Sequence, residues 1–392
     1  MQPSGRGRHR DKPRLEFAFN SAWKIRWDKL DSKSLPHAMT THSKSLSELL
    51  SIELPIIQAP MAGAQGSALA VAVSNAGGLG SLPCAMLTAD AMRKELATIS
   101  AQTSRPFNVN FFCHASPAPD VEREAAWRMR LARYYEEFGM DVNRIEAPPV
   151  RAAFNSDAAD VLSEFKPAVV SFHFGLPSTE LLARVRTWGS KILSSATTVE
   201  EARWLEAHGV DIIIAQGLEA GGHRGIFLSD DLTTQVGTFA LLPQVVRAVR
   251  LPVVAAGGIA DAKGVTAAIA LGAAGVQIGT AYLLCPEVTI SAVHRAALKS
   301  DAARHTAVTN LFTGRPARGI VNRIIRELGP IDTAAPAFPL ATSAITPLRT
   351  KAESLGSNDF SPLWSGQNAS GCKEIPAARL TRELAADLGV SP

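Results

Sequence analysis

Short apolar segments recur from residue 54 onward at a spacing typical of parallel strands. Eight expected strands are residues 55–58, 80–83, 107–112, 168–174, 191–196, 211–216, 252–256 and 275–279. Helical stretches separate most of them, at 89–100, 178–187, 198–208, 241–249 and 262–271, and the last three repeat apolar residues at i, i+3 and i+4. This alternation predicts a (β/α)₈ TIM barrel of the α/β class. A doubly wound open sheet has the same local pattern and is the alternative.

Two stretches exceed what a simple barrel needs. Residues 118–160 mix charged and aromatic residues, so we expect charged surface helices inserted after the third strand. Residues 285–350 begin with a helical run and end in a Pro/Ala/Thr-rich connection, which predicts a small helical cap domain inserted after the eighth strand. The barrel domain is therefore expected at 50–284, and residues 351–392 are expected to return to it.

The charge of the chain is concentrated near its start. Residues 1–50 hold ten Lys/Arg against five Asp/Glu, a formal +5, whereas the whole chain carries +4. The remainder is close to neutral and has no basic stripe, so we expect no nucleic-acid partner. Residues 1–45 lack helical periodicity and a signal-peptide core. They are expected to be a disordered extension or translation begun upstream of a start near Met39, with a targeting peptide as the alternative.

Composition also limits the cellular setting. The chain has 392 residues, of which 46% are hydrophobic and 19% are charged, as is usual for a soluble globular enzyme. No uncharged apolar run reaches the roughly 18 to 20 residues of a membrane helix. The four cysteines, Cys84, Cys113, Cys285 and Cys372, form no Cys-x-x-Cys pair. We therefore expect no membrane partner, no metal and a cytoplasmic location.

One histidine follows a strand in a glycine-rich turn. The apolar segment 211–215 leads directly into Gln-Gly-Leu-Glu-Ala-Gly-Gly-His-Arg-Gly, which contains His223. The carboxyl ends of parallel strands are where barrels bind ligands, so His223 is a candidate for catalysis rather than an ordinary turn histidine. His173, at the end of the fourth strand, is directed to the same mouth. It fits a substrate-contacting residue and a packed structural histidine equally well.

Glycines follow the last two expected strands. Ala-Ala-Gly-Gly-Ile-Ala at 255–260 ends the seventh strand, and Gly-Val-Gln-Ile-Gly-Thr at 275–280 forms the eighth. In TIM barrels the loops after these two strands form a recurrent phosphate site, because glycine lets backbone N–H groups approach the anion. Thr280 can add a hydroxyl. Either segment alone also fits an ordinary tight turn, but the two together favour phosphate binding.

Seven motifs in order resemble one known family. They are PIIQAPMA at 55–62, FNVNF at 107–111, AQGLEAGGHRG at 215–225, AAGGI at 255–259, QIGT at 277–280, FTGRPARG at 312–319 and WSGQ at 364–367. Together they resemble the nitronate monooxygenases, formerly called 2-nitropropane dioxygenases, which are FMN-containing barrel enzymes. The resemblance covers roughly residues 50 to 370.

The resemblance implies a role for each matching position. His223 falls on the catalytic histidine of the family's Gly-Gly-His-x-Gly motif. The expected FMN contacts are Met61, Asn110, Gln216, Gly221, Gly258, Gln277, Ile278, Gly279 and Thr280. The implied reaction oxidises alkyl nitronates, such as propionate 3-nitronate, with O₂ to a carbonyl compound and nitrite. Our hypothesis is that the bound nitronate gives an electron to FMN before O₂ reacts.

Two other functions share many of these features. FMN-dependent enoyl-acyl-carrier-protein reductases, which use NAD(P)H, resemble the same fold and the Gly-Gly-His motif. A flavin-binding protein without catalysis is the third reading, which an intact His223 argues against. In the leading reading the partners are a small nitronate or nitroalkane and O₂, and the protein is a monomer or a homodimer.

Overall fold

Eight parallel strands form the central sheet of the computed structural model, which describes residues 45–144 and 152–389. The strands are β1 (Ile56–Gln58), β2 (Gly80–Pro83), β3 (Phe107–Phe112), β4 (Val169–His173), β5 (Lys191–Ala196), β6 (Ile212–Gln216), β8 (Val253–Ala256) and β9 (Gly275–Ile278). Their order is β1-β9-β8-β6-β5-β4-β3-β2. A parallel bridge between Ile57 and Leu79 joins the first and last strands of this order. The sheet thus closes into a (β/α)₈ barrel, which confirms the predicted fold and excludes the open sheet.

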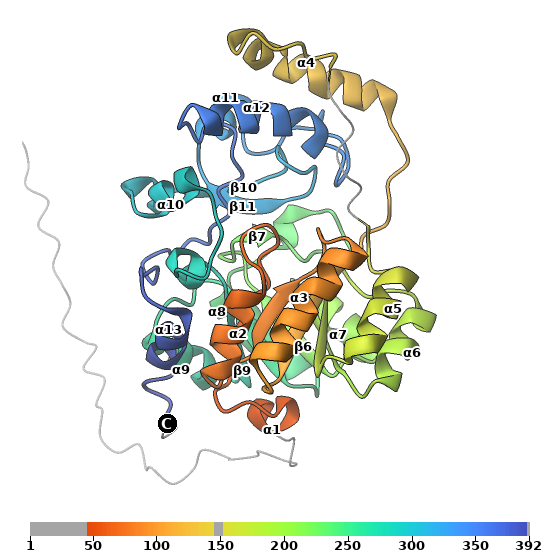
Figure 1. Cartoon of the computed structure of the whole chain (residues 1–392), viewed down its shortest axis with the longest axis vertical. Helices are drawn as coiled ribbons and strands as arrows, with labels where there is room; N and C mark the ends of the chain where they lie inside the picture. Colours follow the sequence, from red (N-terminus) through yellow and green to blue (C-terminus); the bar gives the residue numbers. More distant parts are fainter. Residues whose placement is uncertain (1–44, 145–151, 390–392) are drawn as a thin grey trace, which may run out of the picture. The chain divides into compact units, whose positions relative to one another are not determined.

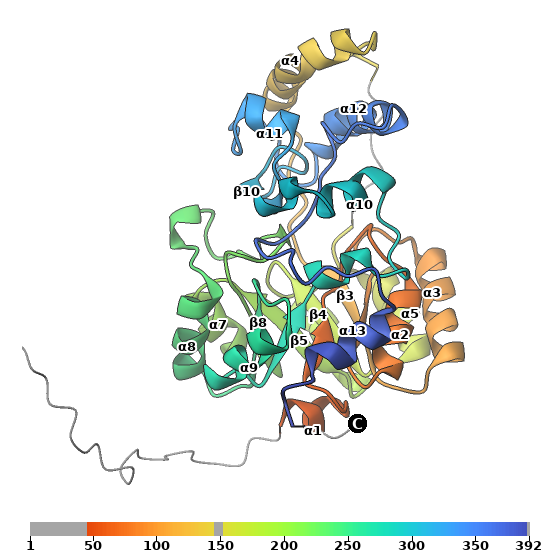
Figure 2. The same cartoon turned by 90° about the vertical axis from the view of Figure 1, so that its left-hand side faces the viewer.

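Helices surround the barrel (Figures 1 and 2). They are α2 (Ser67–Asn75), α3 (Ala89–Gln102), α5 (Ser156–Phe165), α6 (Thr179–Thr187), α7 (Val199–Ala207), α8 (Thr238–Ala248), α9 (Ala262–Ala270) and α13 (Ala377–Leu384). Side chains of Thr88, Ser178, Thr198 and Asp261 accept hydrogen bonds from backbone N–H groups in the first turns of four of them. These caps explain why four of the five helices expected from the sequence begin within a residue of their expected positions.

The inside of the barrel is filled at one end only. Alternate strand residues face inward, so Ile57 and Val254 belong to an inner core whereas their neighbours Ile56 and Val253 pack under the helices. The short helix α1 (Leu46–Leu50) adds Leu46 and Leu50 to that inner core. The amino-terminal end of the barrel is therefore plugged, which leaves the carboxyl-terminal end of the strands for a site.

A cap follows the eighth barrel strand, and it contains strands as well as helices. We use the word cap for α10 (Ala292–Leu298), β10 (Thr306–Thr309), β11 (Ala317–Ile320), α11 (Arg323–Leu328) and α12 (Thr342–Ser354). The strands β10 and β11 form an antiparallel sheet with β7 (Gly222–His223). The sequence predicts a small helical cap at 285–350, and the structure adds the two short strands β10 and β11 to its helices. Two four-residue strands are too short to show a period of two, and the pairing of β11 with β7 is non-local.

The helix α4 (Val121–Glu137) contributes its apolar face to the cap. The sequence predicts surface helices at 118–160, yet Trp127, Leu131, Tyr134 and Tyr135 of α4 are buried. They join a second core with residues of α12, among them Ile345 and Leu348. Of the two helices that the structure describes as starting in this stretch, α5 packs in the barrel's ring and α4 does not. The many charges of α4 obscure a stripe at i, i+4, i+7 and i+8 that faces a partner.

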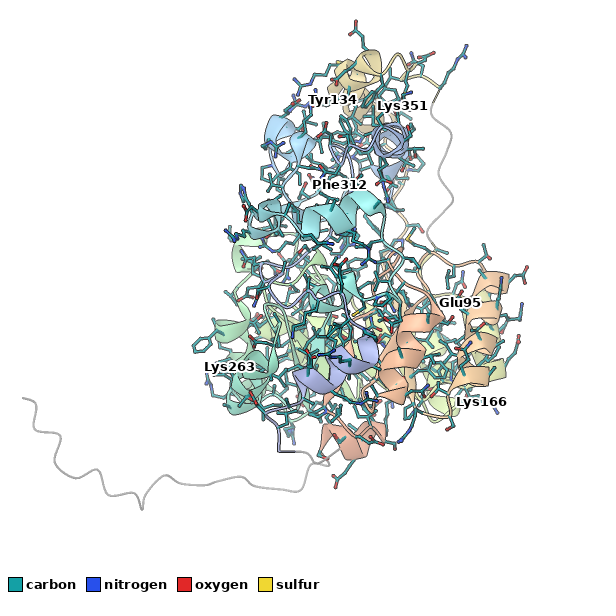
Figure 3. The ribbon with its side chains drawn as sticks, turned by 60° about the vertical axis from the view of Figure 1, so that its left-hand side comes forward. Glu95, Tyr134, Lys166, Lys263, Phe312 and Lys351 are labelled. Carbon is teal, nitrogen blue, oxygen red and sulfur yellow. The ribbon has the colours of Figure 1, made fainter. Side chains whose placement is uncertain are left out.

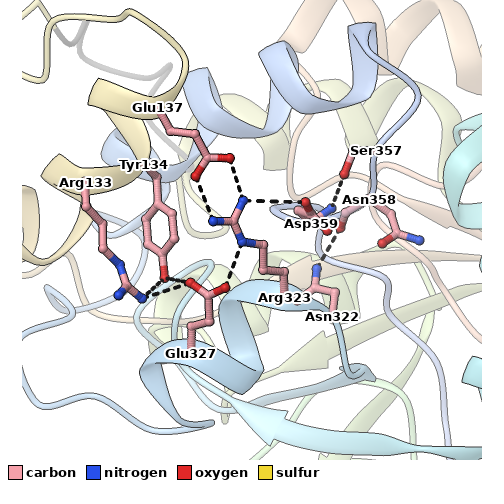
Figure 4. A network of polar contacts seen from close by, with 9 residues as sticks. All are labelled: Arg133, Tyr134, Glu137, Asn322, Arg323, Glu327, Ser357, Asn358 and Asp359. Atoms are coloured by element: carbon pink, nitrogen blue, oxygen red, sulfur yellow. Dashed lines mark hydrogen bonds and ion pairs between the residues drawn. The ribbon is translucent and has the colours of Figure 1, made fainter.

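A polar network joins the same helix to α11 (Figure 4). The Arg323 guanidinium donates to both carboxylate oxygens of Glu137, at 2.8 and 2.7 Å, and to Glu327 at 2.8 Å. The Tyr134 hydroxyl donates to Glu327 at 2.9 Å. Because α4 belongs to the connection after β3, this network ties a barrel loop to the cap.

Some expectations fall partly or wholly beyond the described residues. The predicted leader lies almost entirely within residues 1–44, which are outside them. Among the helices of the described ranges, none has both the length and the apolar character needed to cross a bilayer.

Candidate active site

A cavity of about 270 Å³ lies at the carboxyl ends of the barrel strands, beneath the cap. Every site residue expected from the sequence lines it: Met61, Asn110, His173, Gln216, Gly221, His223, Gly258, Gln277, Ile278, Gly279 and Thr280. They come from the ends of β1, β3, β4, β6, β8 and β9 and from β7. The fold therefore brings the predicted residues to one pocket, as expected of a barrel's catalytic face.

His223 is placed by the cap as much as by the barrel. It lies on β7, whose register pairs it with Ala317 of β11. Its Nε2 atom is 3.0 Å from the Thr313 hydroxyl oxygen, in the connection between β10 and β11. The backbone pairing fixes the Cα position, and the side-chain hydrogen bond fixes the plane of the ring. The imidazole is thus oriented at the cavity wall.

Aromatic rings surround the same imidazole. The ring centroids of Phe112 and Phe174 are both 6.0 Å from that of His223, and those of Phe338 and Trp364 are 5.4 and 5.5 Å away. Phe112 and Phe174 belong to the barrel, whereas the other two belong to the chain after β9. Such an apolar wall lowers the local dielectric, which strengthens electrostatic contacts with a bound molecule.

Two barrel residues hold the backbone of the His223 loop. The Gln216 amide donates from Nε2 to the His223 carbonyl at 3.0 Å, and its Oε1 accepts from Gly225 N–H at 2.7 Å. The Nε2 atom of His173 lies 3.2 Å from the same His223 carbonyl. Both ends of the Gln216 amide therefore engage protein, and this residue positions the loop.

The hydrogen bonds of His173 define its tautomer. A carbonyl oxygen can only accept, so His173 Nε2 carries the hydrogen and donates it. Its Nδ1 then accepts from the Ser195 hydroxyl at 3.1 Å. Burial lowers the pKa of His173 to about 4, against the raising effect of the bond to His223. The ring is therefore neutral near pH 7. His173 positions the His223 backbone and also forms part of the cavity wall.

A buried arginine supports the loop from behind. Arg224 is fully buried and donates to the carbonyls of Gln216 and Gly217 at 2.8 and 2.6 Å, and to the Gln235 side chain at 3.1 Å. Burial lowers the pKa of Arg224 to about 10, so the guanidinium stays charged at neutral pH. Its charge is matched by carbonyl dipoles, which fixes the strand end that precedes His223.

At another part of the cavity, three segments meet in a glycine-lined cradle. The Gly366 N–H donates to Thr280 Oγ1 at 2.9 Å, and the Asn368 side chain donates to the Gly258 carbonyl at 3.0 Å. A Cβ on Gly221 would lie 2.5 Å from the Gly366 nitrogen. Gly258 has φ +74°, a conformation that favours glycine. The segment 365–368, which overlaps the WSGQ motif at 364–367, therefore completes the cradle.

The cavity also contains a buried acceptor without a protein partner. Gln277 Oε1 is buried and has no hydrogen bond within the described part of the chain. The Asn110 amide differs, because its Nδ2 donates to the Ser171 carbonyl at 3.2 Å and to the Ser171 hydroxyl at 2.9 Å. A buried polar atom is normally satisfied, so Gln277 Oε1 is positioned to bind a donor on a ligand.

Several residues in contact with His223 escape the sequence reasoning. Thr313 lies within the FTGRPARG motif, which could have identified it, but nothing local shows that it meets His223. Phe338 sits in the Pro/Ala-rich connection and has no periodic signal. Trp364 begins the WSGQ motif. These contacts join residues some 90 to 140 positions apart, so only the folded chain reveals them.

Metal and thiol chemistry have little support in the described ranges. No group of three or more His, Cys, Asp or Glu residues there could hold a metal ion. All four cysteines are free, and burial raises the pKa of each thiol. Raised thiol pKa values disfavour the nucleophilic thiolate, which agrees with a structural role for these cysteines.

Known proteins resemble this chain over nearly its whole length. The family model for nitronate monooxygenase matches residues 43–387. Nitronate monooxygenases of Paraburkholderia phytofirmans and Pseudomonas aeruginosa are each 43% identical, and cover 89% and 87% of this chain and 96% and 98% of their own lengths.

Solved structures show the same relationship. The nitroalkane oxidase from Streptomyces ansochromogenes has a TM-score of 0.80 at 41% identity, covering 88% of this chain and 98% of its own. FabK from Thermotoga maritima has a TM-score of 0.65 at 29% identity, covering 88% and 96%. With this fold, this site and these relatives, the chain belongs to the nitronate monooxygenase family of oxidoreductases.

Proposed function

We propose that this protein is an FMN-dependent nitronate monooxygenase that converts alkyl nitronates, such as propionate 3-nitronate, and O₂ into a carbonyl compound and nitrite. The observation that carries the proposal is one cavity that combines an oriented histidine, His223, with a buried unpaired acceptor, Gln277 Oε1, and a glycine cradle. The four free cysteines fit a reducing cytoplasm, which we propose as its location.

The donor set of the cavity fits FMN. The uracil-like edge of the flavin ring carries an N–H donor and carbonyl acceptors, and Gln277 Oε1 needs a donor. The phosphate needs close backbone approach, for which Gly258, Gly279 and Thr280 are placed around the cradle. When bound, FMN supplies the electron acceptor for the oxidation. Met61 and Ile278 would offer apolar contact to its ring.

His223 serves two tasks toward the substrate. A nitronate is an anion, and imidazole can donate a hydrogen bond to its oxygen atoms. A neutral nitroalkane must first lose a proton from its α-carbon, and the same imidazole can accept it. Thr313 holds the ring plane during both, since its hydroxyl is 3.0 Å from Nε2. Gln216 and His173 hold the His223 backbone in place.

The aromatic wall complements these polar groups. Phe112, Phe174, Phe338 and Trp364 surround the imidazole with apolar surface. Water is thereby kept from the alkyl part of the substrate and from the hydrogen bond to its nitro or nitronate group. The wall also favours uncharged alkyl chains next to the reacting carbon.

The second candidate is an FMN-dependent enoyl-acyl-carrier-protein reductase. It is favoured by the shared fold with FabK at 29% identity. The nitroalkane oxidase shares more of the sequence, at 41%, and has the higher TM-score. We therefore place nitronate oxidation first, with a small nitronate and O₂ as the partners.

The proposal is tested by the colour and reactivity of the purified protein. We expect a yellow preparation with an oxidised-flavin spectrum. Heating should release the flavin, and chromatography should identify it as FMN. Anaerobic addition of propionate 3-nitronate should bleach the flavin absorbance, and O₂ should restore it with release of nitrite. A colourless protein that does not bind added FMN, or a spectrum unchanged at high nitronate concentration, would contradict the proposal.

A further inference from the structure

A half-buried arginine lies next to the chain that carries both histidines of the site. Arg315 belongs to the connection between β10 and β11, two residues after Thr313. Phe312, which begins the same segment, lies in the lower part of the cap, toward the barrel (Figure 3). Arg315 is not among the residues that line the cavity, so its influence on a bound substrate must pass through its neighbours.

The Arg315 guanidinium contacts the chain beside both histidines. Its Cζ atom lies 4.0 Å from the centroid of the Phe174 ring, and Nη2 donates to the carbonyl of Ile226. Phe174 directly follows His173, and Ile226 is three residues after His223. A cation over an aromatic face and a charged hydrogen bond are both directional attractions. Arg315 therefore joins the chain after β4 to the chain after β7.

Phe174 needs such support because its backbone is strained. Its φ is +69°, in the left-handed region that an aromatic residue rarely adopts. Such a conformation persists only where the surrounding structure holds it. The buried ring stands nearly perpendicular to that of His223, at an interplanar angle of 87°, and its centroid is 4.6 Å from that of His173. A displaced Phe174 ring would therefore open space beside both imidazoles.

The charge of Arg315 is poorly matched for a half-buried group. Its Nε atom is buried and has no hydrogen-bond partner in the described ranges. Burial lowers the pKa of Arg315, against the raising effect of Asp230 and Glu201. The Glu201 carboxylate is already engaged, since it accepts from the Thr197 N–H and hydroxyl and from the Phe227 N–H. Stability alone does not favour a cation placed in this way, which points to a role in the site.

We propose that Arg315 is a positioning residue of the reaction, which clamps Phe174 against His173 and His223 and opposes a positive charge on His173. The clamp fixes the two imidazoles relative to each other, although Arg315 itself lies outside the cavity. For turnover this inference rests on the proposed function, whereas the effect on His173 does not.

The charged groups that face His173 explain that second effect. Burial is the main cause of its low pKa, and the cations Arg315 and Arg224 lower the pKa further. The hydrogen bond to the His223 carbonyl acts in the opposite direction. Neutral His173 keeps the tautomer that donates from Nε2 to that carbonyl and accepts from the Ser195 hydroxyl at Nδ1. Loss of the Arg315 charge should therefore make His173 easier to protonate.

The first test follows the titration of His173 in the absence of substrate. NMR of histidine-labelled protein measures its pKa, and the His173→Gln variant identifies its signal. Arg315→Met and Arg315→Gln both remove the charge, so we expect the pKa of His173 to rise in both. Arg315→Lys keeps the charge and should leave this pKa near its wild-type value. An unchanged pKa in the two neutral variants would overturn the proposal.

The second test measures turnover of a nitronate. We expect Arg315→Met to lower kcat about 3- to 30-fold, the range for one cation–π contact, with little change in KM. The acid limb of the kcat profile should move to higher pH, and Arg315→Lys should recover part of the rate. Because Arg315 acts through the Phe174 ring, its loss should reduce kcat by a smaller factor in a Phe174→Leu background.

Arg326 offers a matched control. It is an exposed arginine on α11 of the same cap, and Arg326→Met should leave kcat, the pH profile and the pKa of His173 at their wild-type values. Equal effects of Arg326→Met and Arg315→Met would overturn the proposal. So would an Arg315→Met variant that loses stability to denaturant but keeps the wild-type kcat and pH profile. A wild type that oxidises no nitronate would instead overturn the proposed function, and the His173 titration would then decide the role of the Arg315 charge.

Discussion

His173 donates a hydrogen bond from Nε2 to the backbone carbonyl of His223, across 3.2 Å. One histidine, at the end of β4, thus holds the short strand that presents the other. The Ser195 hydroxyl, on β5, donates a hydrogen bond to Nδ1 of His173 and so fixes the orientation of that ring. The position of His223 therefore depends on three successive barrel strands, β4, β5 and β6, and on the cap strand β11.

The pKa of His173 predicts a loss of stability in acid. In the folded protein its pKa is about 4, against 6.5 for an unperturbed histidine, so between these values the unfolded chain binds the additional proton. The contribution of His173 to the free energy of unfolding is fully present above pH 6.5 and is lost as the pH falls to about 4. The loss amounts to at most about 3 kcal/mol. His173→Gln should flatten this part of the curve, measured by denaturant unfolding at several pH values.

His294 supplies an internal comparison for that measurement. Its pKa is likewise lowered to about 4, chiefly by burial, so it acts over the same pH window. The free energy of unfolding of the double variant His173→Gln/His294→Gln should depend less on pH than that of either single variant. An identical pH dependence of wild type and His173→Gln would show that the folded His173 is not held neutral.

Replacement of His223 should separate FMN binding from turnover. His223→Asn keeps a hydrogen-bonding side chain at the cavity but has no group that takes up a proton near neutral pH. We expect retained FMN and a loss of nitroalkane turnover of about 10²- to 10⁴-fold. The flavin content by absorbance and initial rates of nitrite release measure the two effects. Wild-type rates in this variant would exclude a catalytic role for His223.

Thr313 is expected to act through His223. Thr313→Val preserves the shape of the side chain but removes the oxygen that lies 3.0 Å from His223 Nε2. We expect kcat to fall about fivefold, in line with about 1 kcal/mol for one neutral hydrogen bond. Thr313→Ser keeps the hydroxyl and should recover most of the rate. Equal losses in the Val and Ser variants would point to packing rather than to the hydrogen bond.

The cradle predicts a sharp difference between two glycine substitutions. Gly221→Ala places a Cβ 2.5 Å from the Gly366 nitrogen, so the segment 365–366 must move. FMN affinity should fall at least tenfold, measured by fluorescence titration of the apoprotein, because that segment completes the cradle. Gly264→Ala, in α9, meets its nearest atom at an ordinary 3.4 Å and should stabilise the helix by up to about 1 kcal/mol without changing FMN affinity. Unchanged affinity in Gly221→Ala would contradict the cradle.

The barrel could be predicted from the sequence because its strands are buried on both faces. Segments such as Ile212–Gln216 read as continuous apolar runs, and the helices between them carry clear caps. The location of His223 followed from a strand end. What could not be predicted is the non-local part: the pairing of β7 with β11, and the packing of α4 on α12. Neither contact has a local pattern that specifies its partner.

The roles of the amide side chains show the same limit. The sequence places Asn110, Gln216 and Gln277 together at strand ends, and all three line the cavity. Only the folded structure distinguishes them, because Gln216 is bonded to the His223 loop and Asn110 to Ser171, whereas Gln277 Oε1 has no partner in the described chain. Hydrogen-bond partners depend on backbone geometry that residue type does not encode.

The most direct test of the account is a side-by-side steady-state assay of the FMN-loaded enzyme with two sets of substrates. One contains propionate 3-nitronate and O₂, and the other contains NAD(P)H with an enoyl thioester. We predict rapid O₂ consumption with formation of nitrite in the first, and little NAD(P)H oxidation in the second. Rapid, thioester-dependent oxidation of NAD(P)H without turnover of the nitronate would contradict the proposed function and favour the reductase.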